Sequence, residues 1–369
     1  MSSLTRPVAV PLESSEHVIM VVHSGPDSGK LRVAIVGCGL IGERRAAQVA
    51  RCPATALAAV VDTNGARAAE VASRYGAEAT GDWREMLCDR ALDIVVVSTP
   101  NAYLAPIAIA ALESGKHVLV EKPPGRNLEE AQRIAAAERA SGGRVLKVGF
   151  NHRYHPALAR AYRLLHAGAI GKPFNARARY GHGGRPGYEK EWRGDPELAG
   201  GGELTDQGVH VADLINWMLG VPHRAFCILQ TAAWPIAPLE DNAFALLDFA
   251  NGCVASFHTS WTQWKNLFSF EIFGTEGALC VEGLGGSYGP QRLVHYRRKP
   301  EGGVPEISEE SFDGPDRSWQ LEWQDFIGAI RGQGACLGTA EDGVAAMATI
   351  DALYRSAAAG VPVGVLQGR

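Results

Sequence analysis

A glycine-rich turn near residue 40 has the spacing of a phosphate-binding loop. Gly37-Cys38-Gly39-Leu40-Ile41-Gly42 follows the pattern G-x-G-x-x-G directly after the apolar run Leu31–Val36. In such a turn the glycines permit a tight bend and close approach of a pyrophosphate, and the N–H groups that open the next helix bind the anion. We therefore predict that a dinucleotide contacts Gly37, Gly39, Leu40, Ile41 and Gly42.

An acidic residue follows the second strand-like run. Asp62 ends the run Leu57–Val61, about 20 residues after the glycine turn, where a carboxylate binds the ribose hydroxyls of a dinucleotide. No basic residue follows Asp62 until Arg67, so nothing adjacent would bind a 2′-phosphate. The expected cofactor is therefore NAD rather than NADP.

Polar residues also follow the third and fourth strand-like runs. Ser98-Thr99-Pro100-Asn101 and Glu121-Lys122-Pro123-Pro124 stand at the carboxyl edge of the expected sheet, where open α/β sheets bind ligands. Pro123 keeps Lys122 extended, so its ammonium can reach a cleft and stabilise alkoxide character on a reacting oxygen. We predict cofactor contacts for Ser98, Thr99, Asn101, Glu121 and Lys122, although a turn with a helix N-cap explains the first segment equally well.

A carboxylate and an imidazole follow the glycine run Gly200–Gly202. Asp206 and His210 are four residues apart, so on an α-helix both side chains would project from one face. This pair suits the oxidation of an alcohol, because the carboxylate can hold a hydroxyl or orient the ring while the imidazole takes the proton. A single histidine is more often structural, and the chain contains 11.

The apolar patterns predict the elements that position these groups. Five short apolar runs alternate with helical segments over residues 31–151, which is typical of βαβ units and of a parallel sheet buried on both faces. Later runs such as Leu267–Phe273 alternate apolar and polar side chains, which indicates an antiparallel sheet with one covered face. Helices are expected near Pro106–Ser114 and Leu204–Leu219, among others.

The expected fold is therefore α/β with two domains. A Rossmann-type parallel-sheet domain would bind the dinucleotide over residues 31–151. An α+β domain with a large, mostly antiparallel open sheet would bind substrate over residues 152–369, and residues 1–30 form a turn-rich tail.

Composition argues against several other classes of protein. Of 369 residues 46% are hydrophobic, and 36 Lys and Arg against 40 Asp and Glu offer no basic face for nucleic acid. The seven cysteines occur singly without metal-ligand spacing, so we expect neither a disulfide framework nor a metal site. No apolar run is long enough to span a membrane, and the first thirty residues lack a signal-peptide pattern. A cytoplasmic location is therefore expected.

Taken together, these segments resemble the Gfo/Idh/MocA family of sugar and inositol dehydrogenase-like oxidoreductases. The resemblance rests on five segments in the family's order: Gly37–Gly42, Ser98–Asn101, Gly115–Pro123, Val148–Tyr154 and Gly200–Asp213. It implies NAD-dependent oxidation of a secondary ring hydroxyl to a ketone, with Lys122, Asp206 and His210 as catalytic residues and His210 as the base. It also implies a homodimer or homotetramer formed through the sheet of the second domain.

The glycine-rich, aromatic segment Tyr180–Arg193 resembles a loop over the substrate in family members that act on complex sugars and aminocyclitols. The expected substrate is a sugar, a cyclitol or an aminoglycoside-type intermediate, as in antibiotic biosynthesis. We predict that it contacts Arg153, His182, Tyr188, Trp192 and Gln207. Arg153 could instead pair with an interdomain acid, and the segment could merely connect the domains.

Two other functions remain open at this point. One is an enzyme of the same family that retains NAD and cleaves a glycosidic bond through transient oxidation. Such an enzyme would release product without net cofactor reduction. The other is a non-catalytic sensor of a sugar or dinucleotide, which would need no base.

Overall fold

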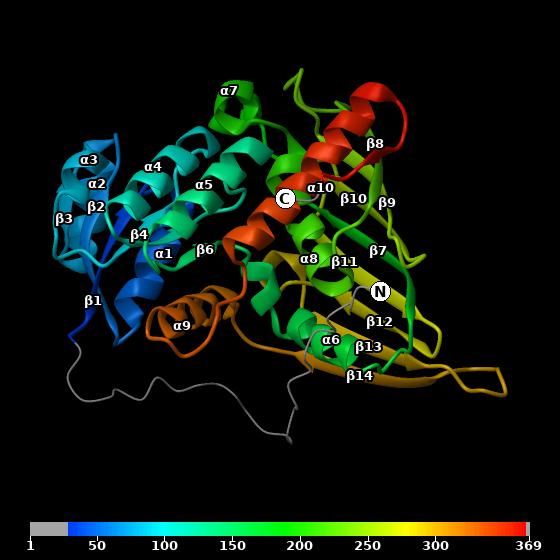
Figure 1. The fold of residues 1–369 in the computed structure, drawn as a ribbon. Helices are drawn as coiled ribbons and strands as arrows, with labels where there is room; N and C mark the ends of the chain where they lie inside the picture. Colours follow the sequence, from blue (N-terminus) through cyan, green and yellow to red (C-terminus); the bar gives the residue numbers. More distant parts are fainter. Residues whose placement is uncertain (1–28, 367–369) are drawn as a thin grey trace, which may run out of the picture.

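The computed structural model describes residues 29–366, so nearly all of the predicted tail at residues 1–30 lies outside the described residues. Two sheets build the molecule, with helices α6, α8 and α10 lying between the parallel sheet and the large sheet (Figure 1). This arrangement confirms the predicted fold class. In the described residues no helix is long and apolar enough to cross a membrane, and no cluster of side chains could hold a metal ion.

The first sheet has six strands, all parallel, in the order β3-β2-β1-β4-β5-β6. Helices cover both faces, so a strand such as β4, whose sequence is Ile-Val-Val-Val, is buried at every residue. Its strands are β1 (Leu31–Val36), β2 (Thr55–Val61), β3 (Glu78–Thr80), β4 (Ile94–Val97), β5 (His117–Val120) and β6 (Leu146–Val148). Its helices are α1 (Leu40–Arg51), α2 (Gly65–Tyr75), α3 (Trp83–Leu87), α4 (Asn101–Glu113) and α5 (Leu128–Ala140).

The second sheet has nine strands in the order β14-β13-β12-β11-β7-β10-β9-β8-β15. Only β7 and β10 run parallel, which makes the sheet mostly antiparallel as predicted. The strands are β7 (Pro173–Gly181), β8 (Arg224–Gln230), β9 (Asn242–Asp248), β10 (Val254–Ser260), β11 (Leu267–Gly274), β12 (Gly277–Glu282), β13 (Gln291–Arg297), β14 (Glu306–Phe312) and β15 (Val363–Gly364). The remaining helices are α6 (Pro156–His166), α7 (Pro196–Ala199), α8 (Val209–Leu219), α9 (Ser318–Ile330) and α10 (Ala340–Ala359).

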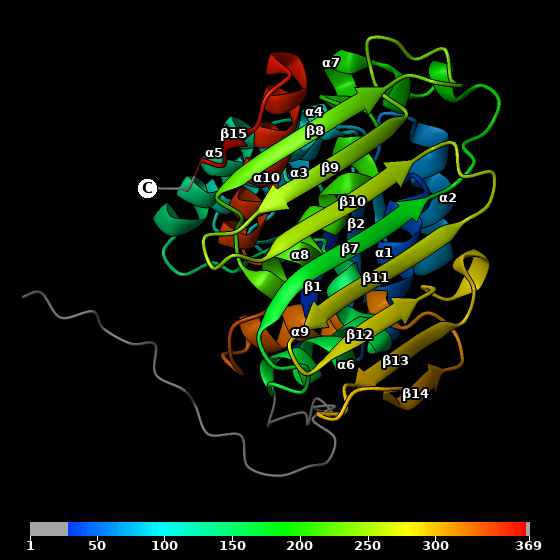
Figure 2. The same ribbon diagram turned by 90° about the vertical axis from the view of Figure 1, so that its right-hand side faces the viewer.

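The two faces of this sheet differ. One face packs on the helices, whereas no other element covers the opposite face in the view of Figure 2. Apolar side chains nevertheless stand on the open face of β8 and β9: Ile228 is 57% exposed, Phe244 44% and Leu246 47%. Apolar side chains exposed side by side are typical of interaction surfaces.

Several elements differ from the sequence-based prediction. Helix α4 begins at Asn101 rather than at Pro106, so this proline lies inside the helix instead of opening it. Short or polar elements escaped prediction because they bury too little apolar surface to show a period: β3, α3 and β14. Strand β12 was also missed.

Helix α9 lies against strands of the first sheet. Its Trp323, Phe326 and Ile327 pack into one apolar cluster with Val33 and Ile35 of β1. This helix packs on the first sheet although it lies in the range predicted for the second domain, and the predicted boundary stays a prediction. A short-range pattern cannot show that a late helix returns to the first sheet.

Candidate active site

The predicted phosphate loop has the close packing that its glycines require. A Cβ on Gly42 would lie 1.9 Å from the carbonyl oxygen of Gly37, and one on Gly37 would lie 2.5 Å from that of Ser98. Gly39 stands at the N-cap of α1 with open space around it and no side-chain cap. Leu40 and Ile41 follow in the first turn, with Leu40 68% exposed. The helix N-terminus is thus free to accept an anion.

Asp62 lies at the carboxyl end of β2, beside this turn. Its carboxylate accepts hydrogen bonds from the main-chain N–H groups of Cys38 and Asn64, each at 2.8 Å. These bonds fix the carboxylate beside the glycine turn, as ribose binding requires. Arg67 approaches it to 3.7 Å.

The other predicted cofactor residues divide into two groups. The Oγ of Ser98 donates to the Gly37 carbonyl at 2.9 Å. The Thr99 hydroxyl is buried and has no hydrogen-bond partner within residues 29–366, so it is available to a ligand. Asn101 instead donates to the carbonyl of Ala199 at 2.8 Å. The Glu121 carboxylate accepts from the Arg45 guanidinium at 2.7 Å.

These observations fit a bound dinucleotide. An uncapped helix N-terminus can hold the pyrophosphate, a fixed carboxylate can hold the ribose, and an unpartnered buried hydroxyl points to a missing polar ligand. The residues Gly39, Asp62 and Thr99 carry this fit.

Lys122 and Asp206 meet across the domain boundary. The Lys122 ammonium donates to the Asp206 carboxylate at 2.9 Å and to the Asp206 main-chain carbonyl at 2.7 Å. The other carboxylate oxygen accepts from the Arg193 guanidinium at 3.0 Å. Although burial opposes ionisation of Asp206, the two cations hold the pKa of Asp206 below its usual range. Lys122 keeps 17% of its side chain exposed.

His210 lies beside this cluster as a neutral ring. It is 5% exposed, and its Nδ1 has no hydrogen-bond partner. Burial lowers the pKa of His210 well below its ordinary value, and the charges of Lys122 and His155 lower it further. A neutral imidazole can accept a proton, which is what a base needs.

The helix that carries these residues is not the one predicted. Residues Leu204–Gly208 form a π-helical turn, and the α-helix begins only at Val209. Asp206 and His210 therefore do not sit one α-helical turn apart. Glu203, just before the turn, is anchored by its N–H to the carbonyl of Glu240 at 2.9 Å. Such turns recur at functional sites.

Arg153 is paired with acidic residues of its own domain rather than with an interdomain acid. Its guanidinium binds the Asp213 carboxylate through two hydrogen bonds, at 2.6 and 3.0 Å, and lies 3.1 Å from Asp342. The side chain is 3% exposed. The contact of Arg153 with substrate stays a prediction.

The other predicted substrate residues surround the mouth of the site. His182 is half-buried and accepts from the N–H of Gly184 at 2.9 Å. Tyr188 is 2% exposed, and Trp192 lies beneath Arg193 with the guanidinium carbon 4.4 Å from its ring centre. The amide of Gln207 donates to Tyr288 at 3.3 Å, whereas its oxygen is buried without a partner.

Sequence reasoning missed two groups at the site. One is His152, whose ring stacks on His210 with centres 3.8 Å apart. The other is Arg193, which holds Asp206. Both lie inside segments that the prediction singled out for neighbouring residues, but nothing local shows which side chain will face the cleft.

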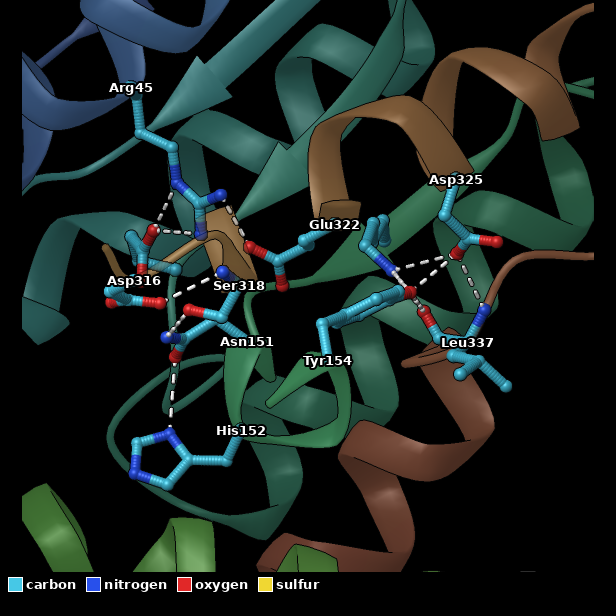
Figure 3. Close-up of polar contacts among 11 residues, drawn as sticks. Arg45, Asn151, His152, Tyr154, Asp316, Ser318, Glu322, Asp325 and Leu337 are labelled. Carbon is cyan, nitrogen blue, oxygen red and sulfur yellow. Dashed lines mark hydrogen bonds and ion pairs between the residues drawn. The ribbon is translucent and has the colours of Figure 1, made fainter. Parts of the chain in front are cut away.

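A polar network fastens this region to α9 and to the first domain (Figure 3). Asn151 donates to the hydroxyl of Ser318 at 3.0 Å, and its carbonyl oxygen lies 3.2 Å from Nδ1 of His152. Arg45 of α1 bridges Glu121 and Glu322 of α9 and is 1% exposed. These are separate groups of contacts, and both end on α9, one from the residue beside His152 and the other from α1 of the first domain.

Fold and site together define an NAD-binding oxidoreductase of two domains. A family model described as "Oxidoreductase family, NAD-binding Rossmann fold" matches residues 31–150, and one described as "GFO/IDH/MocA C-terminal domain" matches residues 158–280. The chain belongs to the GFO/IDH/MocA family.

Curated relatives cover most of the chain. It is 32% identical over 284 residues to levoglucosan dehydrogenase of Pseudarthrobacter phenanthrenivorans, covering 68% of this chain and 73% of the relative. It is 31% identical over 337 residues to 1,5-anhydro-D-fructose reductase of Ensifer adhaerens, covering 89% and 97%. Related dehydrogenases act on sugars or cyclitols, as the inositol 2-dehydrogenase of Rubrobacter xylanophilus illustrates at 26% identity over 91% of this chain and 93% of the relative.

Solved structures give the same picture. Levoglucosan dehydrogenase in complex with NADH and levoglucosan superposes with a TM-score of 0.83 at 28% identity, covering 92% of this chain and 100% of that one. GenD2 from gentamicin A biosynthesis, in complex with NAD, superposes with a TM-score of 0.80 at 27% identity, covering 94% and 100%. These comparisons confirm the predicted family, enzyme class and cofactor.

Proposed function

We propose that the protein oxidises a secondary ring hydroxyl of a sugar, a cyclitol or an aminoglycoside-type intermediate to a ketone. The observation that carries this proposal is the Lys122 ammonium, held on Asp206 beside the neutral ring of His210. Relatives named for levoglucosan and inositol, and the gentamicin-pathway neighbour, support the substrate class.

The three side chains divide the chemistry between them. Lys122 stabilises negative charge on the reacting oxygen, and Asp206 fixes the position of the ammonium. His210 accepts the hydroxyl proton as the C–H bond breaks and the carbonyl forms. Bound NAD supplies the acceptor for the hydride at nicotinamide C4.

A screen of cofactor reduction tests the proposal. NAD and NADP would each be offered with free hexoses, inositols, nucleotide sugars and aminoglycoside intermediates, and absorbance of the reduced nicotinamide recorded. We expect reduction with NAD and one substrate class. No reduction with any class would contradict a dehydrogenase. Cleavage of a glycoside without net reduction of NAD would instead indicate an enzyme that retains its cofactor. Binding of a sugar or of NAD without any turnover would indicate a sensor.

We further propose that copies of the chain associate through the open face of the large sheet, as a homodimer or homotetramer in the cytoplasm. The exposed Ile228, Phe244 and Leu246 on β8 and β9 support this assembly. All seven cysteines are free thiols, which suits a reducing compartment. Light scattering with Phe244→Glu tests the interface, because a charge there should reduce the assembly size.

A further inference from the structure

A strained tryptophan stands at the mouth of the candidate active site. Trp264, in the loop between β10 and β11, has a φ of 55° and is the only non-glycine residue with positive φ in the described part of the chain. Its side chain is 70% exposed. A bulky residue in this conformation is a strained outlier, and such outliers cluster at ligand sites. Burial of its own ring does not offset that strain.

The loop that carries Trp264 packs against the loop that follows β7. The N–H of Gln263 donates to the carbonyl of His182 at 3.2 Å. A Cβ on Gly183 would lie 3.3 Å from the Cα of Trp264, so the two backbones lie close together. Trp264 is therefore a neighbour of the segment that contains the predicted substrate residue His182.

A second indole joins Trp264 on this surface. A Cβ on Gly184 would lie 2.7 Å from the ring of Trp234, so only glycine allows this contact. The ring of Trp234 is held by a hydrogen bond from its Nε1 to the carbonyl of Trp261 at 3.0 Å. Ring centres of Trp234 and Trp264 lie 6.5 Å apart at an angle of 56°, with Trp234 half-buried and Trp264 exposed.

The loop that packs on Trp234 also leads to the proposed reaction centre. His182 stands two residues before Gly184, whose backbone packs against the Trp234 ring. Burial lowers the pKa of His182, and the charges of Asp206 and Lys122 act on it directly. A ligand bound at Lys122 that extended along this loop would therefore meet the two indoles.

We propose that Trp234 and Trp264 form a subsite for a second sugar ring, so that the substrate is a glycoside rather than a free monosaccharide. The inference rests on the proposed function, because it places the oxidised ring at Lys122 and His210. Indoles offer large, rigid, apolar faces at low entropic cost, and the C–H face of a pyranose is complementary to them.

The two arginines of the loop that follows β7 are already paired. The Arg185 guanidinium binds Glu191 at 2.7 and 2.8 Å, and Arg193 binds Asp206. Lys265, next to Trp264, is exposed, so the test below also includes a nucleotide sugar.

The test compares Trp264→Ala, Trp234→Ala and the unchanged protein on a monosaccharide that it oxidises and on disaccharides of the same sugar. We expect kcat/KM for the preferred disaccharide to fall about five- to tenfold in either variant, with the monosaccharide unaffected. Phe174→Ala is the matched control, since this aromatic is 50% exposed near the opposite end of β7, and it should change neither value. An equal loss on both sugars, or none, would overturn the subsite.

Two further measurements separate this inference from the proposed function. Disaccharide binding followed by tryptophan fluorescence reports on the subsite even if no sugar is oxidised. Trp264→Gly should raise Tm by relieving the strained backbone while it abolishes the disaccharide preference. A smaller assembly in Trp264→Ala would instead identify a second copy of the chain as the occupant. Preference for a nucleotide sugar over every disaccharide would also refute the proposal.

Discussion

His152 lies face to face with His210: their ring centres are 3.8 Å apart and their planes are inclined by 25°. The orientation of His152 is fixed from α9, because its Nδ1 lies 3.2 Å from the Asn151 carbonyl oxygen and Asn151 donates to Ser318 (Figure 3). Burial lowers the pKa of His152 well below its ordinary value, and the charge of Lys122 lowers it further, so both rings are neutral. The ring of His210, the proposed base, is therefore positioned by stacking on the fixed ring of His152.

Replacing His152 should impair turnover through the position of His210. We expect His152→Ala to lower kcat about tenfold, because a 1 Å displacement of a reacting group is costly, while the Kd for NAD stays within a few-fold. His152→Phe keeps the stacked face and should retain most of the kcat. Steady-state kinetics and NAD titration of both variants decide between stacking and a direct chemical role. Equal losses in both would refute the stacking role.

Removing either proposed catalytic group should separate chemistry from cofactor binding. Lys122→Ala should lower kcat about 10²–10³-fold, as loss of an electrostatic donor does. His210→Ala should lower kcat about 10²–10⁴-fold. NAD should still raise Tm in both, as a ligand of the folded state does. Unchanged turnover in either variant would remove its assigned role.

The same pair predicts a pH dependence. The cation of Lys122 helps to lower the pKa of His210, so Lys122→Ala should move the acid limb of kcat/KM to higher pH. In the unchanged protein this limb should lie below pH ~6.5, the ordinary value for histidine. A limb that stays in place in the variant would show that another group titrates.

Asp62 should control the choice between NAD and NADP. Asp62→Ser removes the ribose ligand and should raise KM for NAD about tenfold or more. It also releases Arg67, which lies 3.7 Å away, to bind a 2′-phosphate, so kcat/KM for NADP should rise. Adding Arg67→Ala should cancel the gain with NADP. If kcat/KM for NADP stayed high in the double variant, a cation other than Arg67 would bind the 2′-phosphate.

Stability should fall in mild acid because of buried neutral histidines. Burial lowers the pKa of His155 to about 4, although Asp316 lies 4.0 Å from its Nδ1 and the ring of His152 is 5.4 Å away. Below pH ~6.5 this histidine is protonated in the unfolded chain but not in the folded one. The free energy of unfolding therefore falls by about 1.4 kcal/mol per pH unit. Urea unfolding from pH 7 to 5 should show a shallower decline for His155→Phe. Parallel profiles would contradict this cause.

Breaking the buried ion network should cost far more than breaking a surface pair. Arg45→Met leaves Glu121 and Glu322 without their cation and should lower the free energy of unfolding by about 3–5 kcal/mol. The matched Arg74→Met removes exposed pairs with Glu43 and Glu70 and should cost under about 1 kcal/mol. Similar losses in the two variants, measured by urea unfolding, would mean that the contacts of Arg45 with Glu121 and Glu322 do not stabilise the fold more than a surface pair does.

Local sequence determined the dinucleotide half of this protein. The G-x-G-x-x-G turn, the acid at residue 62 and the fully apolar strands each depend on residues that are close together in the sequence. Their spacing alone therefore reveals them. The identities of Lys122, Asp206 and His210 as candidate site residues also came from segments that can be seen one at a time.

Only the tertiary structure decided which side chains meet. Lys122 and Asp206 lie 84 positions apart and join through the packing of two domains. Long-range packing also pairs Arg153 with Asp213, places α9 on the first sheet and stacks His152 on His210. The periodicity of a segment shows which face is apolar, but long-range burial selects the partner that each polar group finds.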